Sequence, residues 1–285
     1  MNFRLGCAIW AYKGWLGDVF PAGSRSTDFL KLYSQRFTTV EGNTTFYSVP
    51  DARTVRRWRE ETPEGFQFCL KLPKTLTHAG LLQPQISEAQ RFVAQMGELG
   101  DRLGPMFAQL PPSYDPTQMP DLQAFLAGLP RNAAEFALEV RHPDWFKEPH
   151  RQRLNDLLAE LGLGRVLLDT RPTYDAPDNP EVQSERRKPR VPSQPIVTAP
   201  FALIRYISHP DLEFNQPYLE EWAKLVDQWL QQGTRVYFFV HCPLEERSPT
   251  NARQFQHLLE QLNPQVPPLP WQQLKPEQLE QLKLF

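Results

Sequence analysis

The stretch Val40-Glu41-Gly42-Asn43-Thr44-Thr45-Phe46-Tyr47 continues a short run from Phe37 whose β-branched residues predict a strand. Because side chains alternate along a strand, Glu41 lies on the face opposite to Val40. A carboxylate therefore stands at a strand end, where a packed core would place Val or Leu. The same pattern of a strand that ends in polar side chains recurs along the chain.

Apolar runs separated by segments of helical periodicity predict eight strands, which indicates an α/β protein. This is the element count of a TIM-like (β/α)8 barrel. One unit departs from the pattern, because residues 171–200 are rich in proline and basic residues and predict a long arm in place of a regular sixth helix. We expect one barrel domain over residues 1–263, with the arm at 171–200 inserted, and a Pro-rich tail over 264–285. The predicted strands span 3–9, 37–40, 66–71, 105–110, 136–141, 165–168, 201–204 and 236–240.

Polar residues occupy the C-terminal ends of nearly all these strands, while their apolar neighbours face the helices. In a barrel of parallel strands these ends meet at one mouth and build the site. Buried polar groups without partners cost about 1–3 kcal/mol each, so we expect a mutually paired network around a ligand position. The set predicted to face this pocket is Glu41, Lys71, Gln109, Glu139, Arg141, Asp169, Arg205 and His241.

Several motifs together resemble the domain of unknown function 72 (YecE-like) family, over essentially the whole chain. The combination is specific although each motif is short. The resemblance implies a TIM-like barrel, and it implies no catalytic roles because the activity of that family is not established. The motifs are Trp10-Ala11-Tyr12, Trp15-Leu16-Gly17, Glu41 to Tyr47, Lys71 with Thr77-His78, Glu139 to Pro143, Asp169 to Pro172, Ile204-Arg205-Tyr206 and Leu284-Phe285.

Glu41 and Glu139 are the two glutamates expected in the pocket. Paired carboxylates serve as general acid and base, or as nucleophile and acid in glycoside cleavage. The alternative is that both form ion pairs with Lys71, Arg141 and Arg205 and only hold the mouth together. These two interpretations remain open from the sequence.

Two further kinds of chemistry involve the same pocket. Lys71 could form a Schiff base if neighbouring cations lower its pKa, or it could simply pair with a carboxylate or an anionic ligand. A single divalent metal ion is less favoured, because three carboxylates face three fixed cations and no surplus of acid remains. No cofactor and no metal site is predicted. The candidate catalytic residues are Glu41, Glu139, Lys71, Asp169 and His241.

The cationic and aromatic residues near the strand ends suit an anionic substrate, either a small molecule or a nucleic acid. Arginines bind phosphate or carboxylate groups, and rings stack on a base or a sugar. The basic arm, with Arg186, Arg187, Lys188 and Arg190, could contribute or could be a solvated charge run. The candidate substrate-binding residues are Trp10, Tyr12, Asn43, Tyr47, Gln109, Arg141, His142 and Arg205.

The chain of 285 residues carries a formal net charge of −2, which excludes general attraction to polyanions. No signal peptide and no apolar run of roughly 20 residues is present, so we expect a cytoplasmic protein without a membrane partner. The three cysteines lack CxxC spacing and predict reduced core thiols.

The C-terminal Gln281-Leu282-Lys283-Leu284-Phe285 resembles the short peptide by which bacterial DNA polymerases and repair proteins dock on the sliding clamp. Gln281, Leu282, Leu284 and Phe285 are the expected contacts, beyond a Pro-rich spacer. The alternative is a last turn that folds back on the barrel. The leading hypothesis is an enzyme acting on a phosphate-bearing substrate, nucleic acid included. A carbohydrate-active hydrolase, or a non-catalytic binder recruited by its tail, are the alternatives.

Overall fold

The computed structural model describes residues 2–178, 180 and 188–273, in which strands alternate with helices. Each of the eight predicted strands coincides with an observed strand. The strands are β1 (Phe3–Cys7), β2 (Thr39–Gly42), β3 (Gln67–Leu70), β4 (Met106–Gln109), β5 (Phe136–Glu139), β6 (Gly164–Asp169), β7 (Phe201–Ile207) and β8 (Arg235–His241). The α-helices are α1 (Phe29–Ser34), α2 (Thr44–Tyr47), α3 (Ala52–Glu61), α4 (Lys74–Thr77), α5 (Ile86–Met96), α6 (Met119–Gly128), α7 (His150–Leu161), α8 (Arg171–Tyr174), α9 (Leu212–Gln231) and α10 (Ser248–Leu262).

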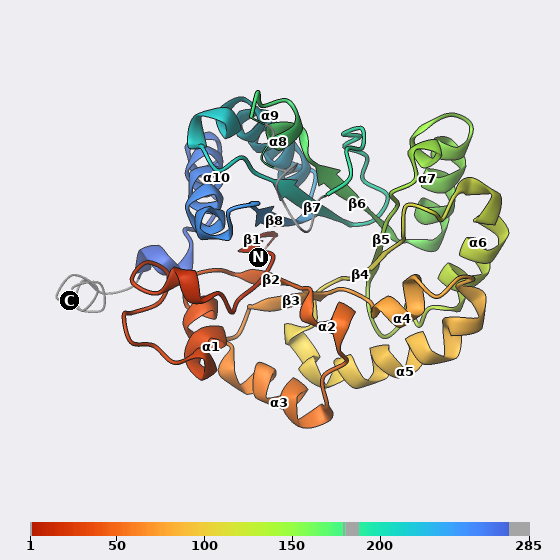
Figure 1. Cartoon of the computed structure of the whole chain (residues 1–285), viewed down its shortest axis with the longest axis horizontal. Helices are drawn as coiled ribbons and strands as arrows, with labels where there is room; N and C mark the ends of the chain where they lie inside the picture. Colours follow the sequence, from red (N-terminus) through yellow and green to blue (C-terminus); the bar gives the residue numbers. More distant parts are fainter. Residues whose placement is uncertain (1, 179, 181–187, 274–285) are drawn as a thin grey trace.

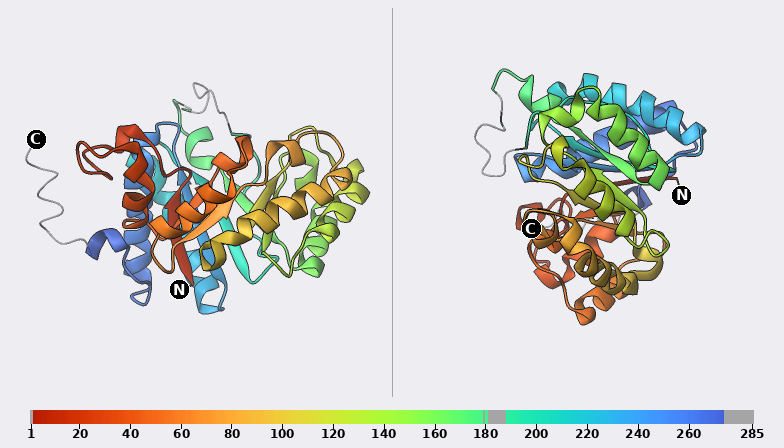
Figure 2. Two further views of the ribbon diagram at one scale, coloured as in Figure 1. Left: turned by 90° about the horizontal axis from the view of Figure 1, so that it is seen from below. Right: turned by 90° about the vertical axis from the view of Figure 1, so that its right-hand side faces the viewer.

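The strands form a mixed α/β fold with parallel pairing. A six-stranded sheet has the order β1-β8-β7-β6-β5-β4, and β2 pairs with β3 in a second sheet. The longer helices lie around the strands, with α3 and α5 on one side and α9 and α10 on the opposite side (Figure 1). The N-terminal half of the chain, red to yellow, and the C-terminal half, green to blue, occupy opposite halves of the molecule (Figure 2).

Two junctions connect the sheets. At the first, β3 and β4 share two isolated parallel bridges, Phe68 with Leu103 and Lys71 with Phe107. The backbone N–H of Leu72 also donates to the carbonyl of Phe107 at 2.9 Å. This junction places the end of β3 beside the end of β4.

At the second junction β1 lies against β2. The N–H of Thr38 donates to the carbonyl of Leu5 at 3.2 Å. The buried hydroxyl of Tyr33 accepts from the N–H of Cys7 at 2.7 Å and donates to the carbonyl of Thr39 at 3.0 Å. Gly6 permits this approach, because a Cβ built there would lie 2.0 Å from the carbonyl oxygen of Thr39.

The core has two layers because side chains alternate along each strand. One layer packs between the strands and the surrounding helices, and includes Val40, Leu70 and Leu138. The other layer is a separate cluster on the opposite strand faces, and it identifies the face on which the polar strand ends lie. This inner cluster consists of Cys69, Phe107, Ala137, Val166, Phe201, Leu203, Tyr237 and Phe239.

The segment between β6 and β7 has little regular structure. Among its described residues the only α-helix is α8, which has four residues. By contrast α7, predicted to end at Gly162, does end there, with Gly162 in the left-handed conformation at φ 69°. Arg186 and Arg187 of the predicted basic arm lie outside the described residues.

The beginning of the predicted Pro-rich tail packs on the protein. Val266, Leu269 and Trp271 are buried, and the Trp271 ring lies edge-on to Phe37 with centroids 5.7 Å apart. The predicted clamp-binding residues 281–285 lie outside the described residues. Within the part of the chain that the structure describes, no helix is long and apolar enough to cross a membrane.

Candidate functional site

Arg205 of β7 joins two carboxylates at the C-terminal ends of the strands. Its guanidinium is 2% exposed and donates from Nε and Nη2 to Oε2 and Oε1 of Glu41, each at 2.8 Å. Nη1 donates to Oε2 of Glu139. The planar fork of arginine matches a carboxylate in this bidentate geometry. One side chain therefore connects β2, β5 and β7.

Glu41 is completely buried and all of its hydrogen-bonding capacity is used. Oε1 also accepts from Nδ2 of Asn43 at 2.6 Å, and Oε2 contacts Nε2 of His241 at 2.9 Å. Burial alone would raise the pKa of Glu41, but Arg205 and His241 outweigh it and hold that pKa well below its usual range. Because an ionised carboxylate only accepts, Nε2 of His241 is the donor. Burial lowers the pKa of His241 to about 4, so the ring is neutral at pH 7.

Glu139 is engaged in the same way. Its Oε1 accepts from Nε of Arg141 at 2.7 Å, in addition to the contact of Oε2 with Arg205. Burial opposes ionisation, but Arg205 and then Arg141 lower the pKa of Glu139 to about 2. A general acid needs a raised pKa, so neither Glu41 nor Glu139 is poised to donate a proton near neutral pH.

Lys71 is the group of the network whose pKa lies near neutrality; outside it, burial raises the pKa of Glu245, in the segment after β8, to about 8. Its buried ammonium donates to Oε1 of Gln109 at 2.7 Å and lies 3.6 Å from the centroid of the Phe46 ring. Burial and the neighbouring positive charge of Arg205 lower the pKa of Lys71 to about 7, against the opposing effect of Glu139. Both protonation states are therefore populated at neutral pH, as proton transfer requires.

Asp169 does not join this network, and its predicted position in the pocket is wrong. It accepts from Nε1 of Trp222 in α9 at 2.7 Å and from Nη2 of Arg171 at 2.8 Å. Val166 belongs to the inner cluster, and Leu168 packs beside Ile207 of β7. The inner face of β6 thus carries 166 and 168, and with a side-chain period of two Asp169 faces the helices.

Because Asp169 lies outside the network, the net charge at the strand ends differs from the predicted balance of three carboxylates and three cations. Glu41 and Glu139 face three cationic side chains, Arg205, Arg141 and Lys71, and the positive charge of Lys188 also acts on His241. Because burial raises the pKa of the nearby Glu245 to about 8, that carboxyl is mostly uncharged at neutral pH, and the positive charges exceed the negative ones while Lys71 is protonated. Only Nε of Arg141 has a hydrogen-bond partner among the described residues, which leaves its two Nη groups for a ligand. In the described ranges no group of three or more His, Cys, Asp or Glu side chains could hold a metal ion. The arrangement favours an anion.

Two of the predicted substrate-binding rings contact other parts of the protein. Trp10 is buried in the helix-facing core, where its ring packs edge-on against Trp58 and Phe68 with centroids 5.2 and 6.0 Å apart. Most of the Trp10 ring is therefore used in core packing. The hydroxyl of Tyr12 donates to the carboxylate of Glu246, in the segment that follows His241 of β8.

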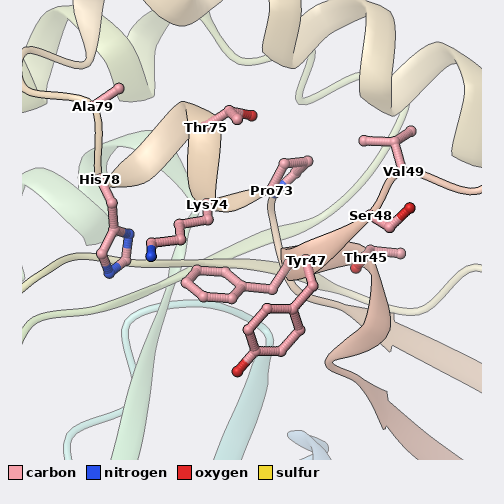
Figure 3. A pocket seen from close by; sticks show the side chains of 10 residues that line it. Thr45, Tyr47, Ser48, Val49, Pro73, Lys74, Thr75, His78 and Ala79 are labelled. Atoms are coloured by element: carbon pink, nitrogen blue, oxygen red, sulfur yellow. The ribbon is translucent and has the colours of Figure 1, made fainter.

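An open cavity of about 430 Å³ lies beside the network, next to Lys71. Phe46 adjoins both, since the Lys71 ammonium lies over its ring and the ring also lines the cavity. The Tyr47 ring is 70% exposed at this cavity. The lining residues are Thr45, Phe46, Tyr47, Ser48, Val49, Pro73, Lys74, Thr75, His78 and Ala79 (Figure 3).

Sequence reasoning named Tyr47 here but assigned no role to Phe46 or His78. Burial, followed by the positive charges of Lys71 and Arg141, lowers the pKa of His78 to about 4. The sequence feature that could have indicated Phe46 is its position beside Tyr47 in the short segment directly after the Glu41 strand, where two consecutive aromatic residues follow a strand end. His142 instead caps a short 3-10 segment, with Nδ1 accepting from the N–H of Asp144 at 3.2 Å.

Comparison with known proteins identifies the family. The model of the family described as "Protein of unknown function DUF72" matches residues 4–274. The chain belongs to the DUF72 family. It is 36% identical over 248 residues to the UPF0759 protein YecE of Escherichia coli K12, which covers 86% of this chain and 88% of that protein. The UPF0759 protein YunF of Bacillus subtilis is 27% identical over 270 residues, 87% of this chain and 93% of its own length.

Two solved DUF72 structures have a similar fold. A DUF72 family protein from Thermotoga maritima superposes with a TM-score of 0.69 at 22% identity, over 91% of this chain and 100% of that one. One from Enterococcus faecalis gives a TM-score of 0.68 at 17% identity, over 90% and 95%. At these identities the likeness concerns the fold alone. No substrate or activity is established by any of these comparisons.

Proposed function

We propose that this DUF72 protein is an enzyme that binds a phosphate-bearing substrate at the mouth formed by its strand ends. The observation that carries the proposal is the surplus positive charge left by two carboxylates among three buried or half-buried cations. The ammonium of Lys71 and the two Nη groups of Arg141 are the donors that an anion meets. Each of the three guanidinium nitrogens of Arg205 already donates to Glu41 or Glu139.

Lys71 is the proposed proton-transfer group of a hydrolase-type reaction. A pKa of about 7 lets it accept or donate a proton at physiological pH. Glu41 and Glu139, the predicted acid and base, have lowered pKa values and act in this proposal as positioning residues for Arg205. Their lowered pKa values disfavour a glycosidase in which Glu41 or Glu139 is the acid, because that role needs a raised pKa.

The proposal is tested by turnover of a panel of phosphate monoesters and diesters. For a substrate that is turned over, Lys71→Met should lower kcat by at least about 100-fold, the lower range for loss of acid–base catalysis. Lys224→Met, on the exposed surface of α9, is the matched control and should leave kcat unchanged. Full activity of Lys71→Met would contradict the catalytic role. Binding of phosphate esters without any turnover would favour the non-catalytic alternative.

We also propose that the two sheets belong to one TIM-like barrel. The proposal is supported by the bridges between β3 and β4 and by the hydrogen bond of Thr38 to Leu5 between β1 and β2. In such a barrel all eight strand ends share one mouth. A crystal structure with β1 and β2 separated by other chain segments would contradict it.

The C-terminal Gln281 to Phe285 is proposed to dock on a bacterial sliding clamp, supported by its sequence alone. Titration of a fluorescent peptide of this segment against purified clamp should give saturable binding. A peptide with Leu284 and Phe285 replaced by alanine should not bind. Equal signals from both peptides would contradict the proposal.

A further inference from the structure

We infer that the cavity beside Lys71 is a subsite for a planar heteroaromatic ring, so that the substrate is a nucleotide held by its phosphate at the mouth and by its base against Tyr47. The inference rests on the proposed phosphate site and names its substrate class. The cavity volume of about 430 Å³ suits a ligand of nucleotide size.

The cavity presents aromatic faces that the protein itself leaves uncovered. Tyr47 is 70% exposed, although large apolar surface is normally covered. Its ring meets Phe46 at 89°, and His78 meets Phe46 at 78°, with centroids 5.2 and 5.1 Å apart. Neither ring is stacked face to face on Phe46, and the exposure of Tyr47 leaves its ring accessible to a ligand. Aromatic side chains of this kind stack on nucleobases.

The cavity adjoins the proposed phosphate site, because the Phe46 ring that lines it lies against the Lys71 ammonium. The positive charges of Lys71, Arg141 and Lys74 all act on His78, which lines the cavity. The Lys74 side chain extends toward His78, with the Tyr47 ring farther along the same cavity (Figure 3). Positive charge at one side of the cavity and the Tyr47 ring at the other suit a ligand with an anionic group and a ring.

A nucleotide fits this lining better than a sugar phosphate without a base. A sugar needs several hydrogen-bonding partners around its ring. The hydroxyl of Thr45, one of the polar groups here, already donates to the carbonyls of Gly42 and Lys71 at 2.9 and 2.6 Å. Phe46, Val49 and Pro73 contribute apolar surface suited to the face or edge of a base.

Calorimetric titration with AMP, ribose 5-phosphate and inorganic phosphate separates the two sites. With the wild-type protein AMP should bind about 5- to 150-fold more tightly than ribose 5-phosphate, the range that stacking of one base provides. Tyr47→Ala should reduce AMP binding to the level of ribose 5-phosphate and leave ribose 5-phosphate unchanged. Tyr47→Phe, which keeps the ring, should preserve the preference for AMP.

Each other outcome has a distinct meaning. If ribose 5-phosphate binds and AMP binds no better, the ring subsite is overturned while the phosphate site stands. If Tyr47→Ala weakens both ligands equally, the side chain supports the phosphate site and the inference is again overturned. If none of the three ligands binds, the proposed function fails and the subsite with it.

Discussion

Arg205 is the side chain on which the buried network depends, because among the described residues it alone forms ion pairs with both Glu41 and Glu139. Arg205→Met would leave two buried carboxylates without their main partner. We expect a loss of about 3–5 kcal/mol in the free energy of unfolding, measured by urea denaturation. Arg56→Met, which breaks an exposed pair with Glu98, should cost less than about 1 kcal/mol. Equal losses in both variants would contradict the role of Arg205.

The same substitution has a pH signature. The pKa of Glu139 is lowered from 4.5 to about 2, so its contribution to stability is fully present above pH 4.5 and is lost as the pH falls toward 2. Arg205→Met removes the largest favourable charge from Glu139. The stability difference between wild type and variant should therefore shrink as the pH falls from 4.5 toward 2. A difference that stays constant over this range would show that the pair is not ionised as described.

For single residues, the sequence predicts which polar side chains lie together at the strand ends better than it predicts their hydrogen-bond partners. The alternation of side chains predicts that Glu41, Lys71, Glu139 and Arg205 share a face, and the structure does place them together. It could not predict that one guanidinium would occupy both carboxylates, because that depends on side-chain geometry across three strands. We therefore assign the proposed proton transfer to Lys71 and not to Glu41 or Glu139.

Strand phase is the element property that sequence reasoning could not fix. The prediction pointed Asp169 inward, whereas the observed β6 has the opposite phase, with Val166 in the inner cluster and Asp169 bonded to Trp222. A phase that differs by one residue places every side chain of a strand on the other face. The hydrogen bond from Trp222 of α9 holds Asp169 on the helix side of the strand. The residues around Asp169 in the sequence do not predict this partner, which lies 53 residues away. The existence of the strand was predictable from its apolar run.

The junction of β1 with β2 makes a sharper element-level prediction. Gly6→Ala would place a Cβ 2.0 Å from the Thr39 carbonyl oxygen, which is backbone and cannot move independently. We expect destabilisation by about 3 kcal/mol or more, since overpacking that forces backbone shifts has costs of this order. Gly97→Ala is the matched control, because its Cβ meets nothing within 4 Å at an ordinary helical φ of −57°. Similar melting temperatures for the two variants would contradict the close approach of the strands.

The mouth is a property of the whole molecule, because residues from position 41 to position 241 meet there only through the arrangement of parallel strands. The fold is shared with other DUF72 structures at low identity. The alternation of strands and helices predicted this class from sequence. The charge of the mouth could not be predicted, because it depends on where a single residue, Asp169, points.

Sulfate binding measured by calorimetry from pH 6 to 9 at constant low ionic strength tests the surplus positive charge most directly, since sulfate stays dianionic over this range. We expect wild-type affinity to fall above about pH 7, by up to about tenfold per pH unit, because binding must then add a proton to Lys71. Lys71→Met should bind more weakly and without this pH dependence, whereas His142→Gln should retain it. Absence of sulfate binding, or affinity identical in wild type and Lys71→Met at every pH, would contradict an anion site at the mouth.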